Sequence, residues 1–255
     1  MASTVLNSAV LKKRVKRFFD SPSAAELSKF IAELSMLGEV ILFGGFLRDV
    51  ALFTARGFSS DLDIVVDCDK RMLHSFFNTR SASLNKFDGY RLEVGSWEVD
   101  VWPLKETWAF KSGLVNYNGR ESLLKTTITN WDAIAYSFLD EKVIVDEDYI
   151  SRIYNGELDL VLFENPSRIG ALLRVLRAIH DKRAKILMPK LLRYLKSELE
   201  VYSAEEIFQE QLRLFNKAYF NTSEIKSFQE EVKSLREDLF GTKIAIRGQN
   251  FKFCF

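Results

Sequence analysis

Apolar residues in the first part of the chain follow two different spacings. Between residues 23 and 37 they recur every three or four positions, which is typical of an amphipathic helix, and Ser23 with Glu26 has the form of a capping box. Residues 40–43 are instead continuously apolar and end at Gly44-Gly45, which is typical of a strand buried on both faces. The pattern therefore predicts a helix followed by a buried strand.

The alternation between strands and short helices continues for about a hundred residues. Residues 46–53 suit a short helix, and residues 62–66 form a second apolar run. Residues 90–94 and 97–102 alternate between apolar and polar positions around Gly95-Ser96, which predicts a β-hairpin. Together these segments predict an α/β (α+β) domain with a mixed sheet.

Helical spacing dominates the chain after about residue 155, and no internal repeat or low-complexity segment interrupts it. We therefore predict two domains, an α/β domain with N-terminal helices over residues 1–150 and an all-helical domain over residues 151–255. An acidic loop around Asp146 marks the boundary between them.

Composition narrows the class of protein. The chain has 255 residues, is 47% hydrophobic and carries a formal charge of +1, which allows a sizeable core and excludes a generally basic nucleic-acid coat. Its two cysteines, Cys68 and Cys254, are too few for a disulfide framework and lack metal-ligand spacing. No apolar stretch reaches the roughly 18–20 residues that a membrane helix needs. We expect a protein of the cytoplasm with no membrane partner.

Three carboxylates occupy predicted strands. Asp61 and Asp63 lie two apart at the start of one strand, so their side chains leave the same face, roughly 7 Å apart. Asp100 lies between two valines on a hairpin strand and needs a partner for its charge, which a divalent cation would supply. Carboxylates on adjacent strands are the hard-oxygen ligands that Mg²⁺ prefers, and they indicate two-metal phosphoryl transfer.

A glycine pair belongs to the same predicted site. Gly44 and Gly45 end a strand and open a helix, where free N–H groups can approach a triphosphate closely. Arg48, one turn into that helix, would add a cationic contact to the phosphates, and Asp49 would either orient it or cap a neighbouring loop. Ser60, directly before the acidic pair, joins them as a candidate nucleotide-binding residue.

In this order and spacing the residues resemble the catalytic head domain of the bacterial-type poly(A) polymerase and CCA-adding tRNA nucleotidyltransferase superfamily, over roughly residues 38–180. The resemblance implies a nucleotidyltransferase head and a helical neck, with two Mg²⁺ ions on the three carboxylates. Residues 127–136 resemble the stretch that joins head to neck, where a polar segment precedes a helix, although Asp132 stands at the usual Asn. Residues 155–159 resemble the Gly-x-x-Asp-Leu loop of the family.

The neck departs from the family pattern. Its Glu-Asp-x-x-Arg motif, which reads the base of the incoming nucleotide, corresponds to Glu164, Asn165 and Arg168, with Asn in place of Asp. An alternative alignment anchored on Arg174 and Arg177 would leave no acidic reader, because Gly170 and Ala171 would take those positions. Base specificity therefore stays open.

Basic residues gather in the same region. Residues 168–196 carry nine basic side chains against one acidic one, which suits an RNA phosphate track as well as the solvated faces of helices. The candidate RNA-binding residues are Arg174, Arg177, Lys182, Arg183 and Lys185. Because only about a hundred residues follow the head, we expect reduced recognition of a whole tRNA, or recognition through a partner protein or a homo-oligomer.

The sequence thus predicts a Mg²⁺-dependent enzyme that transfers a nucleoside monophosphate from an NTP to an RNA 3′ end, with a tRNA or tRNA-like molecule as acceptor. Two alternatives remain. One is a nucleotidyltransferase toxin or resistance enzyme that modifies a tRNA, a protein or a small molecule. The other is a non-catalytic RNA-binding subunit that has kept the fold.

Overall fold

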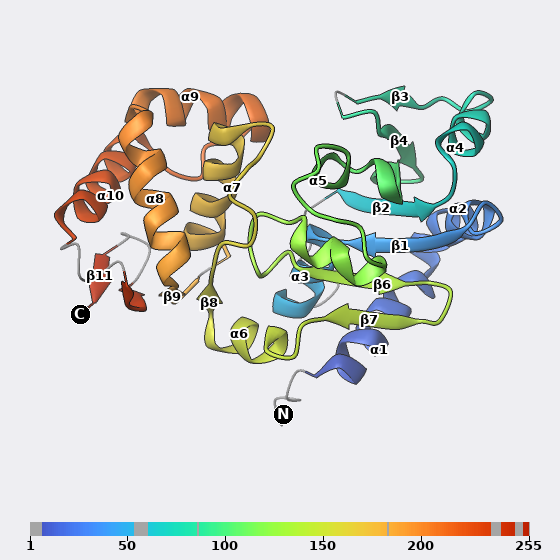
Figure 1. The fold of residues 1–255 in the computed structure, drawn as a ribbon, viewed down its shortest axis with the longest axis horizontal. Coiled ribbons are helices and arrows are strands. Elements are labelled where there is room, and N and C mark those ends of the chain that lie inside the picture. The colour runs from blue at the N-terminus through green and yellow to red at the C-terminus, as the bar shows by residue number, and fades with distance from the viewer. Residues whose placement is uncertain are drawn as a thin grey trace. The chain divides into compact units, whose positions relative to one another are not determined.

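The computed structural model describes residues 7–53, 61–85, 87–182, 184–235, 241–247 and 252–254 (Figure 1). The chain divides into two compact units. The N-terminal unit comprises Met1–Thr127 and Trp131–Ile150, and the C-terminal unit comprises Ile128–Asn130 and Ser151–Phe255.

A seven-stranded mixed sheet forms the centre of the N-terminal unit, as the sequence predicts. The strand order is β3-β4-β5-β2-β1-β6-β7, with β2 and β5 parallel and every other neighbouring pair antiparallel. The strands are β1 (Glu39–Phe43), β2 (Leu62–Asp67), β3 (Ser83–Leu84), β4 (Tyr90–Val94), β5 (Trp97–Pro103), β6 (Ile134–Ser137) and β7 (Lys142–Val145).

Helices cover the sheet because its central strands are apolar on both faces. Three consecutive residues of β1 and three of β2 are buried, so both strands need cover on either side. Helix α3 packs on β1, β2 and β6. The elements are α1 (Ser8–Phe19), η1 (Pro22–Ala24), α2 (Ala25–Leu34), α3 (Gly45–Phe53), α4 (Lys70–Phe77), η2 (Leu104–Glu106), α5 (Trp108–Lys111), η3 (Arg120–Lys125) and α6 (Tyr149–Asn155).

Two local predictions are wrong. The helix expected from Ser23 begins only at Ala25, because a 3-10 turn opened by Pro22 precedes it, and its N-cap residue accepts no side-chain hydrogen bond. The segment expected to form a helix after residue 131 contains strand β6 instead. All four residues of β6 are buried between β1 and β7, so pairing in the sheet overrides the helical interpretation of that short apolar run.

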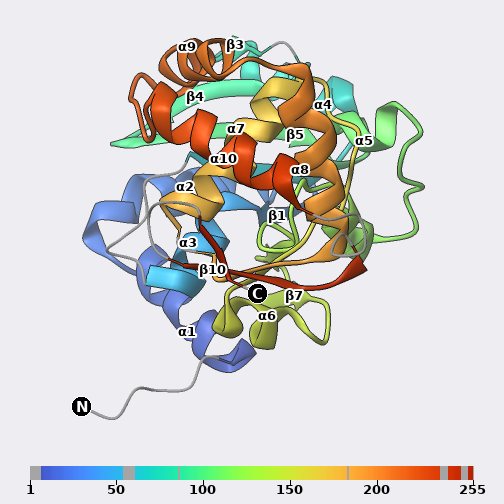
Figure 2. The same ribbon diagram turned by 90° about the vertical axis from the view of Figure 1, so that its left-hand side faces the viewer.

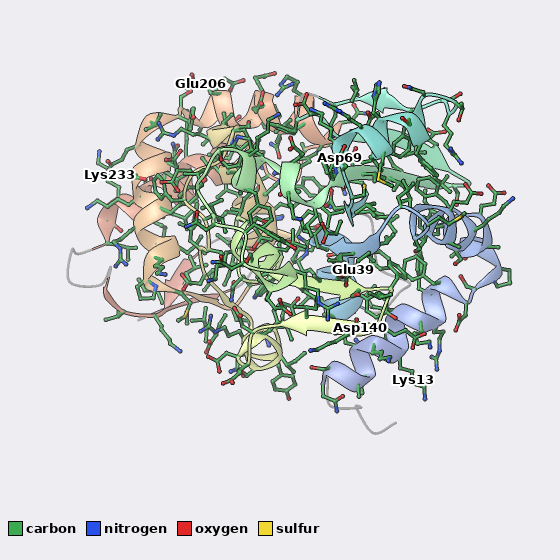
Figure 3. All side chains as sticks on the ribbon, turned by 45° about the vertical axis from the view of Figure 1, so that its right-hand side comes forward. Lys13, Glu39, Asp69, Asp140, Glu206 and Lys233 are labelled. Atoms are coloured by element: carbon green, nitrogen blue, oxygen red, sulfur yellow. The ribbon has the colours of Figure 1, made fainter. Side chains whose placement is uncertain are left out.

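Ion pairs of Arg120 connect the first residue of β1 with the turn between β6 and β7. Arg120 donates to Glu39 Oε1 at 2.5 Å and to Asp140 Oδ2 at 2.5 Å, and these two acidic residues are labelled in Figure 3. Ser137 also donates to Glu39. The hydrogen bonds to Asp140 and Glu39 raise the pKa of Arg120 above its usual range. The guanidinium therefore stays charged and joins three segments of the unit.

The C-terminal unit is mostly helical (Figure 2). Its long helices are α7 (Arg168–His180), α8 (Pro189–Val201), α9 (Ala204–Phe215) and α10 (Thr222–Ser234), and capping boxes open α9 and α10. A four-stranded sheet in the order β11-β10-β9-β8 accompanies them, formed by β8 (Glu157–Leu158), β9 (Ile186–Leu187), β10 (Ile244–Arg247) and β11 (Lys252–Cys254).

The fold class is therefore confirmed as an α/β head with a helical C-terminal region. The expectation of an all-helical C-terminal domain overlooks the small sheet, because strands of two residues are too short to show an alternating pattern. Among the described helices, none is both long and apolar enough to span a bilayer.

Candidate active site

Strand register aligns two of the predicted carboxylates. On the parallel strands β2 and β5, Asp63 pairs with Asp100, and on the other side of β2 the partner of Asp63 is Phe43. Asp63 therefore lies beside the end of β1, where the glycine turn begins. Asp61 precedes it by two residues, just before the strand begins.

The glycine turn lies next to Asp63. Gly44 has a φ of +77°, a left-handed conformation that side chains rarely adopt, and its N–H donates to the carbonyl of Ile134 at 3.0 Å. A Cβ atom added to Gly44 would lie 3.6 Å from Asp63 Oδ2. Gly45 is the first residue of α3. The end of β1, the start of α3 and the side chain of Asp63 therefore lie next to one another.

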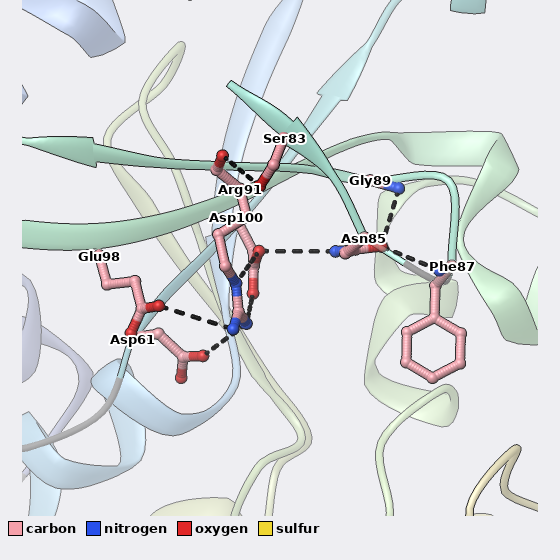
Figure 4. Close-up of polar contacts among 8 residues, drawn as sticks. All are labelled: Asp61, Ser83, Asn85, Phe87, Gly89, Arg91, Glu98 and Asp100. Carbon is pink, nitrogen blue, oxygen red and sulfur yellow. Dashed lines mark hydrogen bonds and ion pairs between the residues drawn. The ribbon is translucent and has the colours of Figure 1, made fainter. Parts of the chain in front are cut away.

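Asp100 has a protein partner, which the sequence interpretation missed. Arg91, opposite Asp100 on β4, donates from Nε to Asp100 Oδ1 at 2.9 Å and from Nη2 to Oδ2 (Figure 4). The carboxylate is only 3% exposed. Asn85 Nδ2 lies 3.5 Å from Oδ1, with its own Oδ1 fixed by the backbone N–H groups of Phe87 and Gly89.

Two more carboxylates lie near the guanidinium of Arg91. Nη2 lies 3.4 Å from Asp61 Oδ2, and Nη1 lies 3.5 Å from Glu98 Oε1. The hydrogen bonds to Asp100 raise the pKa of Arg91, and the charges of Glu98 and Asp61 add to this effect. A permanently charged guanidinium therefore stands among three carboxylates on one face of the sheet.

The register of the predicted hairpin would have revealed the pairing of Arg91 with Asp100. A two-residue turn at Gly95-Ser96 pairs Val94 with Trp97, and counting outward three residues on each strand puts Arg91 opposite Asp100. From its sequence position, Asp100 is expected to have a divalent cation as the partner for its charge. A cross-strand arginine supplies that charge in the structure.

The donor chemistry fits Mg²⁺ in part. Among the described residues, no three carboxylate, imidazole or thiol groups stand together as a complete ligand set. Asp61 is partly exposed and Asp63 half-buried, and both are hard oxygen donors. Because Mg²⁺ is usually held by one or two carboxylates together with substrate phosphates, this pair fits it.

Arg48 points into the protein rather than toward solvent. Its side chain is 14% exposed, with Nε donating to Asp49 Oδ1 at 2.9 Å and Nη1 donating to Asp132 Oδ1. Burial alone would lower the pKa of Arg48, but the charges of Asp132 and Asp49 outweigh it and raise the pKa. Asp49 thus contacts Arg48, in keeping with one of its two expected roles, and Asp132 extends the pair into an internal ion network; the phosphate contact of Arg48 stays a prediction. Ser60 lies outside the described residues.

The predicted base-reading residues surround the start of α7. Ser167 caps the helix, and Asn165 Oδ1 accepts a hydrogen bond from the Ser167 N–H at 3.2 Å. Glu164 is exposed. Arg168 donates from Nη2 to Glu198 Oε1 at 2.7 Å and from Nε to Oε2 at 3.2 Å. These hydrogen bonds raise the pKa of Arg168.

The candidate RNA-binding residues differ in their surroundings. Arg174 and Lys185 are exposed. Arg177 is half-buried, with its guanidinium 4.7 Å from the ring centre of Tyr219 and its Nε 3.5 Å from Asp181. Lys182 is 6% exposed, so it does not offer its charge to a surface-bound strand. Arg183 lies outside the described residues.

Comparisons with known proteins point to one fold. Neither protein-family models nor curated protein sequences match the chain. Solved structures do match, and one is a CCA-adding enzyme in an apo form, with a TM-score of 0.58 and 15% identity over 93% of this chain and 59% of that one. The chain has the fold of the CCA-adding enzymes.

Two further structures support the assignment of the fold. A Thermotoga maritima CCA-adding enzyme complexed with tRNA matches with a TM-score of 0.53 and 18% identity, over 93% of this chain and 59% of that one. A tRNA nucleotidyltransferase complexed with a primer tRNA and an incoming ATP analogue matches with a TM-score of 0.53 and 16% identity, over 80% and 59%. The chain spans less than two thirds of the length of these proteins. The resemblance predicted from sequence is confirmed at the level of the fold.

Proposed function

We propose that the chain is the head and neck of a Mg²⁺-dependent nucleotidyltransferase. It would transfer a nucleoside monophosphate from an NTP to the 3′ hydroxyl of an RNA, with a tRNA or tRNA-like acceptor, and release pyrophosphate. The observation that carries this proposal is the placement of Asp63 beside the Gly44 turn, with Asp61 two residues before it, in a fold whose solved examples include a complex with CTP and one with a primer tRNA and an ATP analogue.

Each part of this site has a separate task. Asp61 and Asp63 would hold Mg²⁺, and the resemblance implies a second ion, for which the exposed Glu98 is a further donor on the same face. A bound Mg²⁺ would neutralise phosphate charge and lower the pKa of the attacking hydroxyl. The turn at Gly44 leaves room for the phosphates, because a side chain there would project toward Asp63. The start of α3 favours negative charge nearby.

The acceptor part of the proposal rests on two kinds of support. Two of the similar structures contain tRNA. In the C-terminal unit, Arg174 and Lys185 expose positive charge suited to a phosphate backbone. We propose that recognition of the acceptor is shared with a partner protein or a second copy of the chain. We place the activity in the cytoplasm, in keeping with its sparse use of cysteine.

The test is nucleotidyl transfer to total cellular RNA. The chain is incubated with Mg²⁺ and each of the four labelled NTPs, and the products are separated by size. A matched pair of variants is Asp63→Asn and Asp67→Asn. Asp63 is the second residue of β2 and Asp67 the last, and Asp67 contacts Lys105, away from the Gly44 turn.

The expected result is a labelled RNA band that persists in Asp67→Asn and disappears in Asp63→Asn. Its size and NTP preference would identify the acceptor and the nucleotide. If no RNA is labelled although Mg²⁺-NTP binds, the RNA acceptor is wrong and a protein or small molecule takes its place. If Mg²⁺-NTP does not bind, the chain is not a nucleotidyltransferase.

A further inference from the structure

On the basis of the nucleotidyl transfer proposed above, we propose that Asp100 is a positioning residue and not a metal ligand. It holds Arg91, and Arg91 is the cation that binds the phosphates of the incoming nucleoside triphosphate. Asp100 therefore has a different role from the metal ligand that the sequence alone suggests.

The first step concerns the oxygens of Asp100. Both are hydrogen-bonded by the fork of Arg91, and Oδ1 also lies 3.5 Å from Asn85 Nδ2. The carboxylate is buried, so coordination of a metal would require breaking a buried two-point ion pair. Such a step is costly, because it leaves uncompensated charge in a poorly solvated place. Asp100 is therefore committed to Arg91.

The second step concerns the N–H groups of Arg91 that Asp100 does not hold. The side chain is 45% exposed, and its distances to Asp61 and Glu98 are 3.4 and 3.5 Å, longer than the 2.9 Å hydrogen bond to Asp100 Oδ1. Contacts between exposed charges of this kind hold weakly. A metal ion that draws Asp61 into its coordination sphere would leave two groups of Arg91 available to phosphate oxygens, Nη1 and the N–H of Nη2 that does not face Asp100.

Guanidinium chemistry suits this role. Its planar fork makes paired hydrogen bonds to carboxylate on one side and to phosphate on the other without changing its charge. Before nucleotide binds, the same group reduces the mutual repulsion of Asp61, Glu98 and Asp100 (Figure 4). One residue thus keeps the acidic face stable and offers a phosphate contact.

The third step is the orientation of Arg48, the residue that the sequence suggests for the phosphates. Arg48 is largely buried and engages Asp49 and Asp132. Releasing it would break its ion pair with Asp49, which is fully buried. Between these two arginines, Arg91 is the one whose guanidinium lies beside Asp61 and is partly exposed.

The experiment uses two probes on the full chain. Mn²⁺ binding is measured by electron paramagnetic resonance, and binding of non-hydrolysable α,β-methylene-ATP and α,β-methylene-CTP is measured by calorimetry in the presence of Mn²⁺. The variants are Arg91→Ala, Arg91→Lys, Asp100→Asn and Asp63→Asn. Arg80→Ala serves as the matched control, because Arg80 pairs with Glu33 and contacts none of these carboxylates in the described structure.

We expect Asp63→Asn to lose Mn²⁺ and Asp100→Asn to keep it. Arg91→Ala and Asp100→Asn should each weaken the triphosphate analogues by roughly 10- to 100-fold, as for loss of a hydrogen bond to a charged group, and the double variant should be no weaker than Arg91→Ala. AMP and CMP lack the β and γ phosphates, so their affinities should not change. Arg91→Lys should restore part of the triphosphate affinity.

Each other result has a defined meaning. Loss of Mn²⁺ in Asp100→Asn with an unchanged circular dichroism spectrum would make Asp100 a metal ligand and overturn the inference, while leaving nucleotidyl transfer intact. If Arg91→Ala binds the triphosphate analogues as tightly as the wild type, the inference is overturned. A variant that binds them normally is folded, so this result does not depend on a separate test of folding. Failure of the wild type to bind Mn²⁺ with either analogue would instead overturn the proposed function itself.

Discussion

Asp63 Oδ2 lies 3.6 Å from the point that a Cβ atom of Gly44 would occupy. The pairing of two neighbouring strands brings them together, since the partner of Asp63 on β1 is Phe43, directly before the glycine. The space above Asp63 is therefore kept open by the absence of a side chain. Backbone conformation and site geometry depend on the same residue, and a matched pair of variants separates these two effects.

Gly44→Ala should lose affinity for Mn²⁺-NTP and also lose stability. Gly113→Ala is the control, because Gly113 has a similar φ of +73° but nothing within 4 Å of its added Cβ. Both variants should lose about 1–2 kcal/mol of unfolding free energy from the left-handed backbone. Urea unfolding measures that loss, and calorimetry measures nucleotide affinity. Equal nucleotide affinity in both variants would show that the glycine turn is not part of the binding site.

The network of Arg48, Asp49 and Asp132 should matter for folding. Arg48→Ala removes a largely buried cation that contacts both the fully buried Asp49 and Asp132, so unfolding free energy should fall by about 3–5 kcal/mol. Arg80→Ala breaks a more exposed pair with Glu33, and should cost about 1 kcal/mol or less. Urea titrations followed by tryptophan fluorescence compare the two. Similar losses would mean that Asp49 has other adequate partners.

Much of the N-terminal unit could be predicted because its strands are long enough to show their pattern. The apolar run before Gly44 and the alternating hairpin both appear in the sheet as expected. The hydrophobic pattern did not distinguish strand β6 from a helix, because four buried residues such as Ile134 and Ala135 suit either, and only pairing with β1 and β7 decides.

The candidate site could be predicted only where its residues are close in sequence. Asp61 and Asp63 share a strand face by spacing alone, and Gly44 marks a turn by its residue type. The partners of Asp100 and Arg48 depend on tertiary contacts between segments 9 and 84 residues apart. Charge balance in a buried site therefore could not be assigned from motifs, although the hairpin register would have suggested Arg91.

Cys68 should be unreactive at neutral pH. Burial, followed by the negative charges of Asp67 and Asp69, raises the pKa of its thiol to about 11. A raised pKa lowers the thiolate fraction, so at pH 8 roughly one thiol in a thousand is ionised, against about a quarter for an ordinary cysteine. Alkylation by iodoacetamide should accelerate about tenfold per pH unit up to pH 10.

The measurement uses a Cys254→Ser variant, so that Cys68 is the only thiol, with mass spectrometry as readout. The same variant unfolded in urea is the control, because solvent exposure restores an ordinary thiol. A rate that levels off near pH 8.5 in the folded protein would contradict the expected protection.

Variants of Arg168 and Arg174 can distinguish the two alignments of the neck motif. Arg168 is fixed by a two-point hydrogen bond to Glu198, whereas Arg174 is exposed on the same helix. If Arg168 reads the base, Arg168→Lys should change the ratio of kcat/KM among the four NTPs, because a lysine cannot keep the planar fork. Arg174→Lys should leave this ratio unchanged. The reverse result would favour the alternative alignment and place Arg174 at the base.

RNA contact should depend on the exposed basic residues and not on the buried one. A cation that contacts a phosphate releases a counterion, so each such residue adds about 0.7 to the slope of log affinity against log salt for a single strand. Arg174→Ala and Lys185→Ala should each reduce the slope by about that amount. Lys182→Met, which removes a charge that is 6% exposed, should leave it unchanged. Filter binding of a labelled tRNA across a KCl series measures all three, and a slope reduced only in Lys182→Met would contradict the RNA surface proposed here.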